Sequence, residues 1–385
     1  MSNCFRPRAV MPGSGKPGRQ GLNLKAPALT NPDKFDERTL MSTPNIRSRK
    51  LMLVSLLTAG ALTVAGCSSD ATNDSTSSES TNSTEAADIS EATAEGETRT
   101  VTDSEGNDVE VPAEPQRIVT LHFAATEALV DLGLTPVGQG SFNDGLLPPE
   151  KAADIKDVPT VNTEDGLQLE AIAALKPDLI LVPNMIEPSD VEQLREIAPS
   201  YIYTHSGEER ANWSGSVAQI ADATNQSAKI DELENAMEKR QEEIAETYSA
   251  ELADRRFAVL NSYSEQEVAL NSDTSMLGSV LGPAGVQWSQ QQNDIVGDED
   301  GGELTVSLEQ LNEAVGDADV ILYGTDLNQK PTEYYETMSK SDMFQNLDAV
   351  KDGKVYPIGK MTVAGYTDAM ASLDMLKELL KDIKG

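Results

Sequence analysis

The chain has 385 residues, of which 38% are hydrophobic and 4% aromatic, and its formal net charge is -34 at pH 7. The hydrophobic content is enough for a packed core. The charge disfavours nucleic acid as a partner, because phosphates would be repelled, and favours a monomer. The only histidines are His122 and His205, so several imidazoles cannot gather around a bare metal ion. We therefore expect neither a protein-held metal site nor a resident cofactor.

An export signal is predicted near the N-terminus. Basic residues precede an apolar run, 51–64, which ends in small residues before Cys67. This run is shorter than the roughly 20 residues that span a bilayer. The segment Val64-Ala65-Gly66-Cys67 resembles the lipobox of bacterial lipoproteins. Residues 41–66 are therefore interpreted as a signal peptide and Cys67 as the lipidation site, which would hold the protein on the extracytoplasmic face of the cell membrane. The alternative is ordinary cleavage beside an incidental cysteine.

Two stretches around this signal show no pattern of a fold. Residues 1–40 are rich in Pro, Gly and basic residues, and Met41 stands where a signal peptide would start. We interpret residues 1–40 as a start-site artefact. Residues 67–100 are almost entirely polar and cannot bury enough surface to offset their chain entropy, so they are predicted to form a disordered tether. Cys4 and Cys67 both precede the globular pattern, so no internal disulfide is available to the fold.

From residue 101 the pattern alternates between strand and helix. Between residues 101 and 222, an extended piece is predicted at 109–112, strands at 117–121, 135–138, 177–182 and 201–203, and helices at 124–132, 169–175 and 191–197. Such alternation favours a parallel or mixed sheet covered by helices. Residues 101–222 are therefore predicted to form an N-terminal α/β lobe.

A long helix precedes a second segment of the same kind. Residues 228–250 show apolar residues near helical spacing without Gly or Pro, and at ~1.5 Å per residue they would span about 35 Å. After it, strands are predicted at 256–260, 318–323 and 354–358, and helices at 276–281, 308–314 and 367–383. The predicted fold class is α/β, with a connecting helix at 223–252, a C-terminal α/β lobe at 253–385, and a ligand cleft between the lobes.

These segments resemble the substrate-binding proteins of ABC importers for iron-siderophores and vitamin B12. The resemblance runs from about residue 101 to the end of the chain. Its pieces are Val111-Pro112, Pro115 to Val119, Thr126-Glu127, Leu132-Gly133, Pro136 to Gly138, Leu169 to Ile172, Leu175 to Ile180, Val306 to Leu311, Asp319 to Ile321, Ala349 to Tyr356 and Leu373-Asp374. It implies two lobes joined by a rigid helix that limits closure, and delivery of a captured chelate to a membrane permease and its ATPase.

The resemblance also assigns a role to two glutamates. In similar proteins one glutamate on each lobe meets arginines of the permease, and Glu170 and Glu309 stand at the matching positions. Such charge pairs set orientation and encounter rate more than affinity. Both residues also have a purely structural interpretation, because a carboxylate near a helix start is stabilised by the helix dipole and Ser307 can cap the second helix.

Ligand-binding candidates are sought at the ends of the predicted strands, since ligands of α/β lobes lie beyond the carboxyl ends of strands, and also in the polar stretch after Gly285 and just before the last helix. They are His122, Asn184, Arg210, Trp213, Tyr263, Trp288, Tyr323 and Tyr366. Aromatic walls with one or two cations suit a large chelate whose iron is already wrapped by its own ligands.

Some of these residues also have structural interpretations. Phe123 and Tyr323 could belong to a core, and His122 could act as a local cap. Arg210 could pair with Glu208 and Glu209. Trp288, in a polar stretch, is hard to place in a core and is expected to contact ligand.

The sparse cations favour one class of ligand. An anionic tris-catecholate complex would need several Arg or Lys in a desolvated cleft. The cations expected near the strand ends are mainly Arg210, with Lys330 or Lys360. A weakly charged ferric hydroxamate is therefore preferred. Haem is the alternative, because His122 or Tyr263 could bind its iron, and cobalamin also stays open.

Two other classes of protein are weighed against a binding protein. A lipid-anchored hydrolase is a remote alternative, and the sequence contains no Gly-x-Ser-x-Gly elbow, P-loop or His-Glu-x-x-His motif. With two histidines the usual general base is scarce, so no enzyme is expected. An adhesin or structural module would be an unusual use of two α/β lobes around a cleft.

Overall fold

The computed structural model describes residues 96–143, 145–163 and 166–384. All of them fall within one of the chain's two units, Asp88–Gly385. The predicted start-site artefact, signal peptide, lipidation site at Cys67 and most of the predicted tether lie outside the described residues. The predicted tether extends too far, because strand β1 (Thr98–Thr102) begins before residue 100.

The first lobe is built around a three-stranded parallel sheet in the order β3-β7-β8. Its central strand, β7 (Leu179–Pro183), is buried along its whole length between β3 (Ile118–Thr120) and β8 (Ser200–Tyr203). Continuous apolar runs of this kind are typical of parallel strands covered on both faces. The sequence therefore locates these three strands to within a few residues.

Shorter elements complete the first lobe. A hairpin pairs β1 with β2 (Asp108–Pro112), and a second small sheet contains β4 (Gln139–Gly140), β5 (Thr160–Thr163) and β6 (Gly166–Leu167). The strand predicted at 135–138 is displaced, since only Gly138 makes a bridge, to Val119, before β4 begins. The helices are α1 (Phe123–Asp131), α2 (Pro149–Ala152), α3 (Leu169–Ala174), α4 (Pro188–Arg195), the 3-10 turn η1 (Glu208–Ala211) and α5 (Trp213–Ala223).

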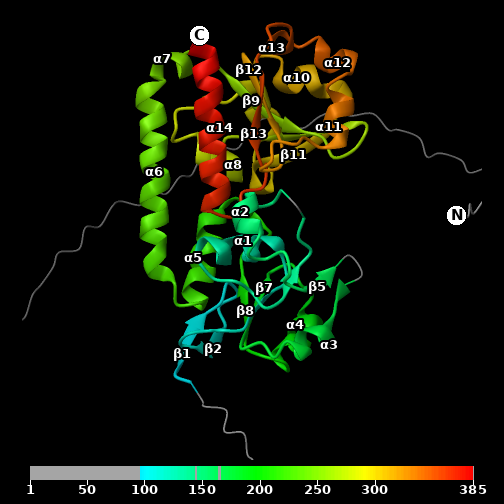
Figure 1. Cartoon of the computed structure of the whole chain (residues 1–385). Helices are drawn as coiled ribbons and strands as arrows, with labels where there is room; N and C mark the ends of the chain where they lie inside the picture. Colours follow the sequence, from blue (N-terminus) through cyan, green and yellow to red (C-terminus); the bar gives the residue numbers. More distant parts are fainter. Residues whose placement is uncertain (1–95, 144, 164–165, 385) are drawn as a thin grey trace, which may run out of the picture. The chain divides into compact units, whose positions relative to one another are not determined.

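The connection between the lobes is helical. Helix α6 (Ile230–Thr247) follows the turn η2 (Ser227–Lys229) and is followed by α7 (Ser249–Leu252). The predicted single helix at 228–250 is interrupted at Tyr248, whose backbone is not helical (φ -115°). Figure 1 shows α6 beside α14 (Tyr366–Lys384) of the second lobe, with its N-terminal end at the first lobe.

The second lobe contains a five-stranded mixed sheet in the order β11-β10-β9-β12-β13. Strands β9 (Phe257–Asn261), β12 (Val320–Gly324) and β13 (Val355–Gly359) are parallel, whereas β10 (Glu267–Asn271) and β11 (Glu303–Ser307) pair antiparallel. The remaining elements are α8 (Met276–Leu281), α9 (Gln290–Val296), η3 (Asp300–Gly302), η4 (Leu308–Gln310), α10 (Leu311–Val315), α11 (Glu333–Met338), α12 (Asp342–Gln345) and α13 (Asp348–Lys351).

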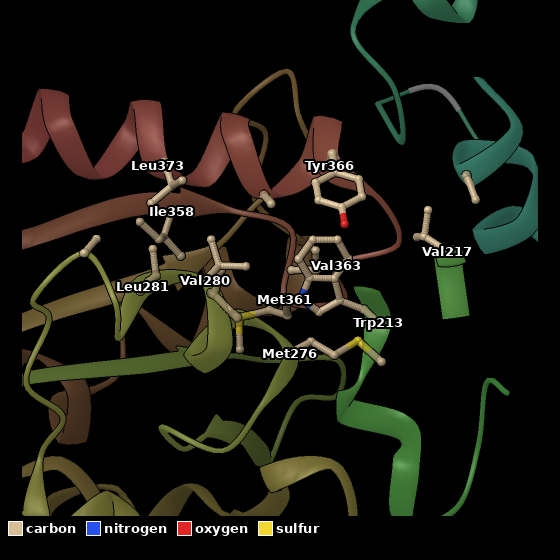
Figure 2. Packing of buried hydrophobic residues seen from close by; sticks show 14 of the residues in the cluster. Trp213, Val217, Met276, Val280, Leu281, Ile358, Met361, Val363, Tyr366 and Leu373 are labelled. Atoms are coloured by element: carbon tan, nitrogen blue, oxygen red, sulfur yellow. The ribbon is translucent and has the colours of Figure 1, made fainter. Parts of the chain in front are cut away.

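One hydrophobic core cluster extends through both lobes, and each lobe has a further cluster of its own. Trp213, at the start of α5, packs with its ring edge-to-face against Tyr366 of α14, with centroids 5.1 Å apart. Its indole Nε1 donates to Ser279 Oγ on α8 at 3.0 Å. Figure 2 shows Trp213 among Met276, Met361 and other side chains of the second lobe. Separating the lobes would expose this packing, so the junction resists a wide opening.

Candidate ligand cleft

A cavity of about 690 Å³ lies where the carboxyl ends of strands from both lobes meet. Its lining residues from the first lobe are Phe123, Asn143, Gly145 and Leu146. Those from the second lobe are Asn261, Tyr263, Thr325, Asp326, Lys330, Pro331, Thr332, Glu333, Glu336, Lys360, Met361 and Thr362. Phe123 follows β3, while Asn261, Thr325 and Lys360 stand at or just after the ends of β9, β12 and β13. This is the position in which α/β lobes place their ligands.

Aromatic and apolar side chains form part of the wall. Phe123 begins α1, and Tyr263 extends from the loop after β9 with 58% of its surface exposed. An exposed tyrosine of this extent at a cavity offers a flat contact surface that the fold itself leaves uncovered. Phe123 itself is half-buried, lines the cavity and is absent from the core clusters of the described residues, so it is a cleft residue.

The two histidines lie together beside Phe123. The ring centroids of His122 and His205 are 4.1 Å apart, and those of His122 and Phe123 are 4.2 Å apart. Burial, with the neighbouring His205, lowers the pKa of His122 to about 3, and burial, with the charge of Arg210, lowers the pKa of His205 to about 4. Both imidazoles are thus neutral at neutral pH. His122 also caps α1, because its Nδ1 accepts from Ala124 N at 3.3 Å.

Arg210 connects the lobes at a second cavity, of about 320 Å³. It forms an ion pair with Glu303 of β11 at 2.7 Å, and Glu303 also accepts from Asn271 at 3.1 Å. The interpretation that pairs Arg210 with Glu208 and Glu209 is therefore wrong, because its partner lies in the other lobe. Tyr263, Met361 and Thr362 line both cavities, so the two spaces adjoin.

The charges around the larger cavity are mostly compensated or acidic. Lys360 is only 6% exposed and is held by two carboxylates, Glu127 and Asp368, at 2.6 and 2.8 Å. The other lysine of the lining, Lys330, is exposed. Asp326, Glu333 and Glu336 also line the cavity. A strongly anionic ligand would therefore meet little uncompensated positive charge among the described residues.

Several of the predicted ligand residues lie in the protein interior. Trp288 is 8% exposed within the core, and its Nε1 donates to Asn271 O at 2.8 Å. The expectation that it does not fit a core is wrong, because its indole N–H finds a backbone acceptor. Trp213 and Tyr366 occupy the core between the lobes, although Trp213 borders a small cavity of about 20 Å³ beside Arg210. Tyr323 stacks on Tyr335 at 4.3 Å and packs against the second lobe's core.

Asn184 has a local structural task. Its Oδ1 accepts from the backbone N–H groups of His205 and Ser206 at 2.9 Å each, so it fixes the loop that carries His205. The structure thus brings His122, Arg210 and Tyr263 to the two adjoining cavities or directly beside them. It adds Asn143, Met361 and Thr362 to the wall. These additions occupy loops, and no pattern in the sequence distinguishes them from other loop residues.

The two docking candidates are both exposed on the surface. Glu170 is in the first turn of α3, and Glu309 follows Ser307, whose hydroxyl accepts from Glu309 N at 3.3 Å in a capping box. They lie on different lobes. In the described part of the chain, no helix is long and apolar enough to cross a membrane, and no group of three or more His, Cys, Asp or Glu residues could hold a metal ion.

Known proteins resemble this chain over most of its length. It is 27% identical over 339 residues to the Fe(3+)-citrate-binding protein YfmC of Bacillus subtilis, covering 87% of this chain and 98% of that protein. It is 25% identical over 340 residues to the iron(3+)-hydroxamate-binding protein YxeB of the same organism, covering 84% and 96%. The siderophore periplasmic binding protein from the fuscachelin gene cluster of Thermobifida fusca has a similar structure, with a TM-score of 0.60, 28% identity, and coverage of 70% and 97%. The periplasmic binding protein family matches residues 118–362, and the chain belongs to this family.

Proposed function

We propose that this protein is an extracytoplasmic solute-binding lipoprotein that captures a ferric siderophore in the cleft between its lobes and delivers it to the permease of an ABC importer. The observation that carries the proposal is the cavity of about 690 Å³ at the strand ends, with Phe123 and Tyr263 in its wall. Its volume is within the range of small-molecule sites. A chelate buried there would contact flat aromatic surface.

A weakly charged hydroxamate complex is the preferred ligand. The buried Lys360 is neutralised by carboxylates, Arg210 is paired with Glu303, and the exposed Lys330 shares the cavity lining with three acidic residues. An anionic catecholate or citrate complex would have to displace such a pair, which costs desolvation and lost Coulomb energy. The relatives YfmC and YxeB bear names that include ferric citrate and ferric hydroxamate respectively, so both ligand classes belong in the test.

Haem is the second candidate, for one specific reason. A neutral imidazole is the form that binds iron, and the lowered pKa values of His122 and His205 keep both rings neutral. Delivery to the importer and lipid attachment at Cys67 rest on the family, on Glu170 and Glu309, and on the sequence Val64-Ala65-Gly66-Cys67. Transport by such a protein requires binding and release, and no chemical step on the ligand.

The test is a titration of tryptophan fluorescence with a ferric trihydroxamate, a ferric catecholate, ferric citrate, haemin and cobalamin. Trp213 borders a small cavity with Arg210, which also lines the cavity next to the cleft, so we expect its fluorescence to report a bound absorbing ligand. We expect saturable quenching by the hydroxamate, weakened by Phe123→Ala and Tyr263→Ala. The matched control is Tyr334→Ala, an exposed tyrosine outside the cavity lining. Saturation by haemin alone would transfer the assignment to haem, and no response to any iron compound would refute the proposal.

A further inference from the structure

A buried cluster of three charged side chains joins the lobes beneath the cleft. Lys360 Nζ donates to both carboxylate oxygens of Glu127 on α1, at 2.7 and 2.6 Å, and to Asp368 Oδ2 on α14 at 2.8 Å. Glu127 and Asp368 are each 1% exposed. An arrangement of one cation and two carboxylates would leave one uncompensated negative charge in the interior, which is costly.

One atom of the cluster indicates how that charge is removed. Asp368 Oδ2 accepts from Lys360 and from Ala364 N at 2.9 Å, whereas the buried Asp368 Oδ1 has no hydrogen-bond donor among the described residues. A proton on Glu127 would neutralise the cluster and supply a donor beside that orphaned oxygen. Burial, and then the nearby Asp368 carboxylate, raise the pKa of Glu127 well above its usual value, although Lys360 opposes this.

The titratable neighbours of the cluster on α1, within the described part of the chain, are either paired elsewhere or neutral. Asp131, one turn further along α1, is engaged by Lys151 Nζ at 2.8 Å and by Thr367 N at 3.0 Å. His122, at the other end of α1, is neutral because burial lowers its pKa to about 3. The carboxylates of Asp368 and Glu127 outweigh the effect of burial and raise the pKa of Lys360, so the lysine stays charged.

The cluster is also part of the cleft. Lys360 lines the cavity, its Nζ lies 5.6 Å from the centroid of the Phe123 ring, and Leu146 O is 3.4 Å from Nζ. Movement of Lys360 would therefore shift both walls. We propose that Glu127, Lys360 and Asp368 form an interlobe cluster with a proton held on Glu127. This interlobe cluster positions Phe123 and fixes the width of the ligand cleft.

The first test measures the distance between the lobes without ligand. Spin labels at Glu192→Cys on α4 and Met343→Cys on α12 are placed in the full chain, with Cys4→Ser and Cys67→Ser. We expect Lys360→Met to broaden the distance distribution, because the interlobe cluster loses the ammonium group that donates to both carboxylates. Glu127→Gln, which has the shape of the protonated acid, should keep the distribution narrow. The control Lys377→Met removes a surface partner of Glu243 and should resemble the parent chain. A narrow distribution in Lys360→Met would overturn the positioning role.

The second test addresses the proton and needs no altered lysine. On folding at neutral pH the parent chain should take up about one proton. Its free energy of unfolding, measured in urea, should therefore fall as the pH rises, and this dependence on pH should be absent in Glu127→Gln. The exposed Glu150→Gln is the control. The protonated carboxyl should also give an infrared band that Glu127→Gln lacks. Identical pH slopes in the parent and Glu127→Gln, or absence of the band, would refute the buried proton.

The effect on the ligand rests on the proposed function and is separable from it. With a ferric hydroxamate, Lys360→Met should weaken binding at least about tenfold and Glu127→Gln less than about twofold. If no chelate binds the parent chain, the proposed function fails. The distance and pH measurements still decide whether the interlobe cluster fixes the lobes and holds a proton.

Discussion

Arg210 of the first lobe and Glu303 of the second form an ion pair at 2.7 Å at the cavity of about 320 Å³. Tyr263 lines this cavity and the adjoining larger one. Both side chains are partly exposed, so the pair contributes little to stability. Its consequence concerns the ligand, because Glu303 neutralises Arg210, the one arginine among the described residues that line the two cavities.

Replacement of Glu303 by glutamine should make the cleft more receptive to anions. The freed Arg210 would attract ferric citrate, and we expect its affinity to rise about five- to tenfold, equivalent to about 1 kcal/mol. Binding of an uncharged ferric hydroxamate should change far less. Titrations of both chelates at low ionic strength measure the difference, with the exposed Glu299→Gln as the control. Equal effects on both chelates would contradict a role in charge selection.

Trp213 should matter for stability more than for direct contact with the ligand. It is 4% exposed and inserted between the lobes, so Trp213→Ala should lower the free energy of unfolding by about 3–5 kcal/mol. Tyr334→Ala, on the surface, should change it by less than about 0.5 kcal/mol. Urea unfolding followed by circular dichroism gives both values. A Trp213→Ala chain of normal stability that no longer binds any chelate would instead make Trp213 a ligand contact.

The paired histidines predict sensitivity to acid. Folding lowers the pKa of His122 from 6.5 to about 3 and that of His205 from 6.5 to about 4. Between these values and pH 6.5, the unfolded chain therefore binds more protons than the folded chain. Their contribution to stability is full above pH 6.5 and is lost as the pH falls toward 4 and then 3. His122→Asn keeps an acceptor for the cap of α1 and should reduce the loss. Unfolding midpoints measured across this range test this, and an unchanged pH slope in His122→Asn would contradict it.

The elements that the sequence locates well are those whose apolar pattern matches their burial, either a continuous run in a strand covered on both faces or one apolar face of an amphipathic helix. Strand β7 and helix α14 are predicted to within two residues because burial determines their composition. Strands β10 and β11 escape prediction because they are partly exposed and set among Ser, Asn and Asp, and β11 is at the edge of the sheet. The pairing of β11 with β10 joins residues that are far apart in the sequence, which no local pattern records.

The same limit applies to the cleft. His122, Arg210 and Tyr263 follow strands, so a strand-end rule selects them, but the rule equally selects Tyr323, which packs against the core of the second lobe. Trp288, chosen for its polar neighbours, lies in the core. Side-chain direction after a strand depends on the loop that follows. One partner of Lys360 likewise cannot be found from the sequence, because Glu127 lies 233 residues away.

The exposed glutamates Glu170 and Glu309 should act in transport and leave capture intact. Both face solvent on different lobes, so reversal of their charge in Glu170→Lys combined with Glu309→Lys should not disturb the fold or the affinity for a ferric hydroxamate. Uptake of radioactive iron by cells that depend on this protein should fall at least about tenfold, since opposed charges orient the encounter with the permease. The matched control reverses two other exposed glutamates, Glu192 and Glu378, and should leave uptake unchanged. Equal loss in both double variants would point to net charge alone, and normal uptake in the Glu170 and Glu309 variant would exclude them from docking.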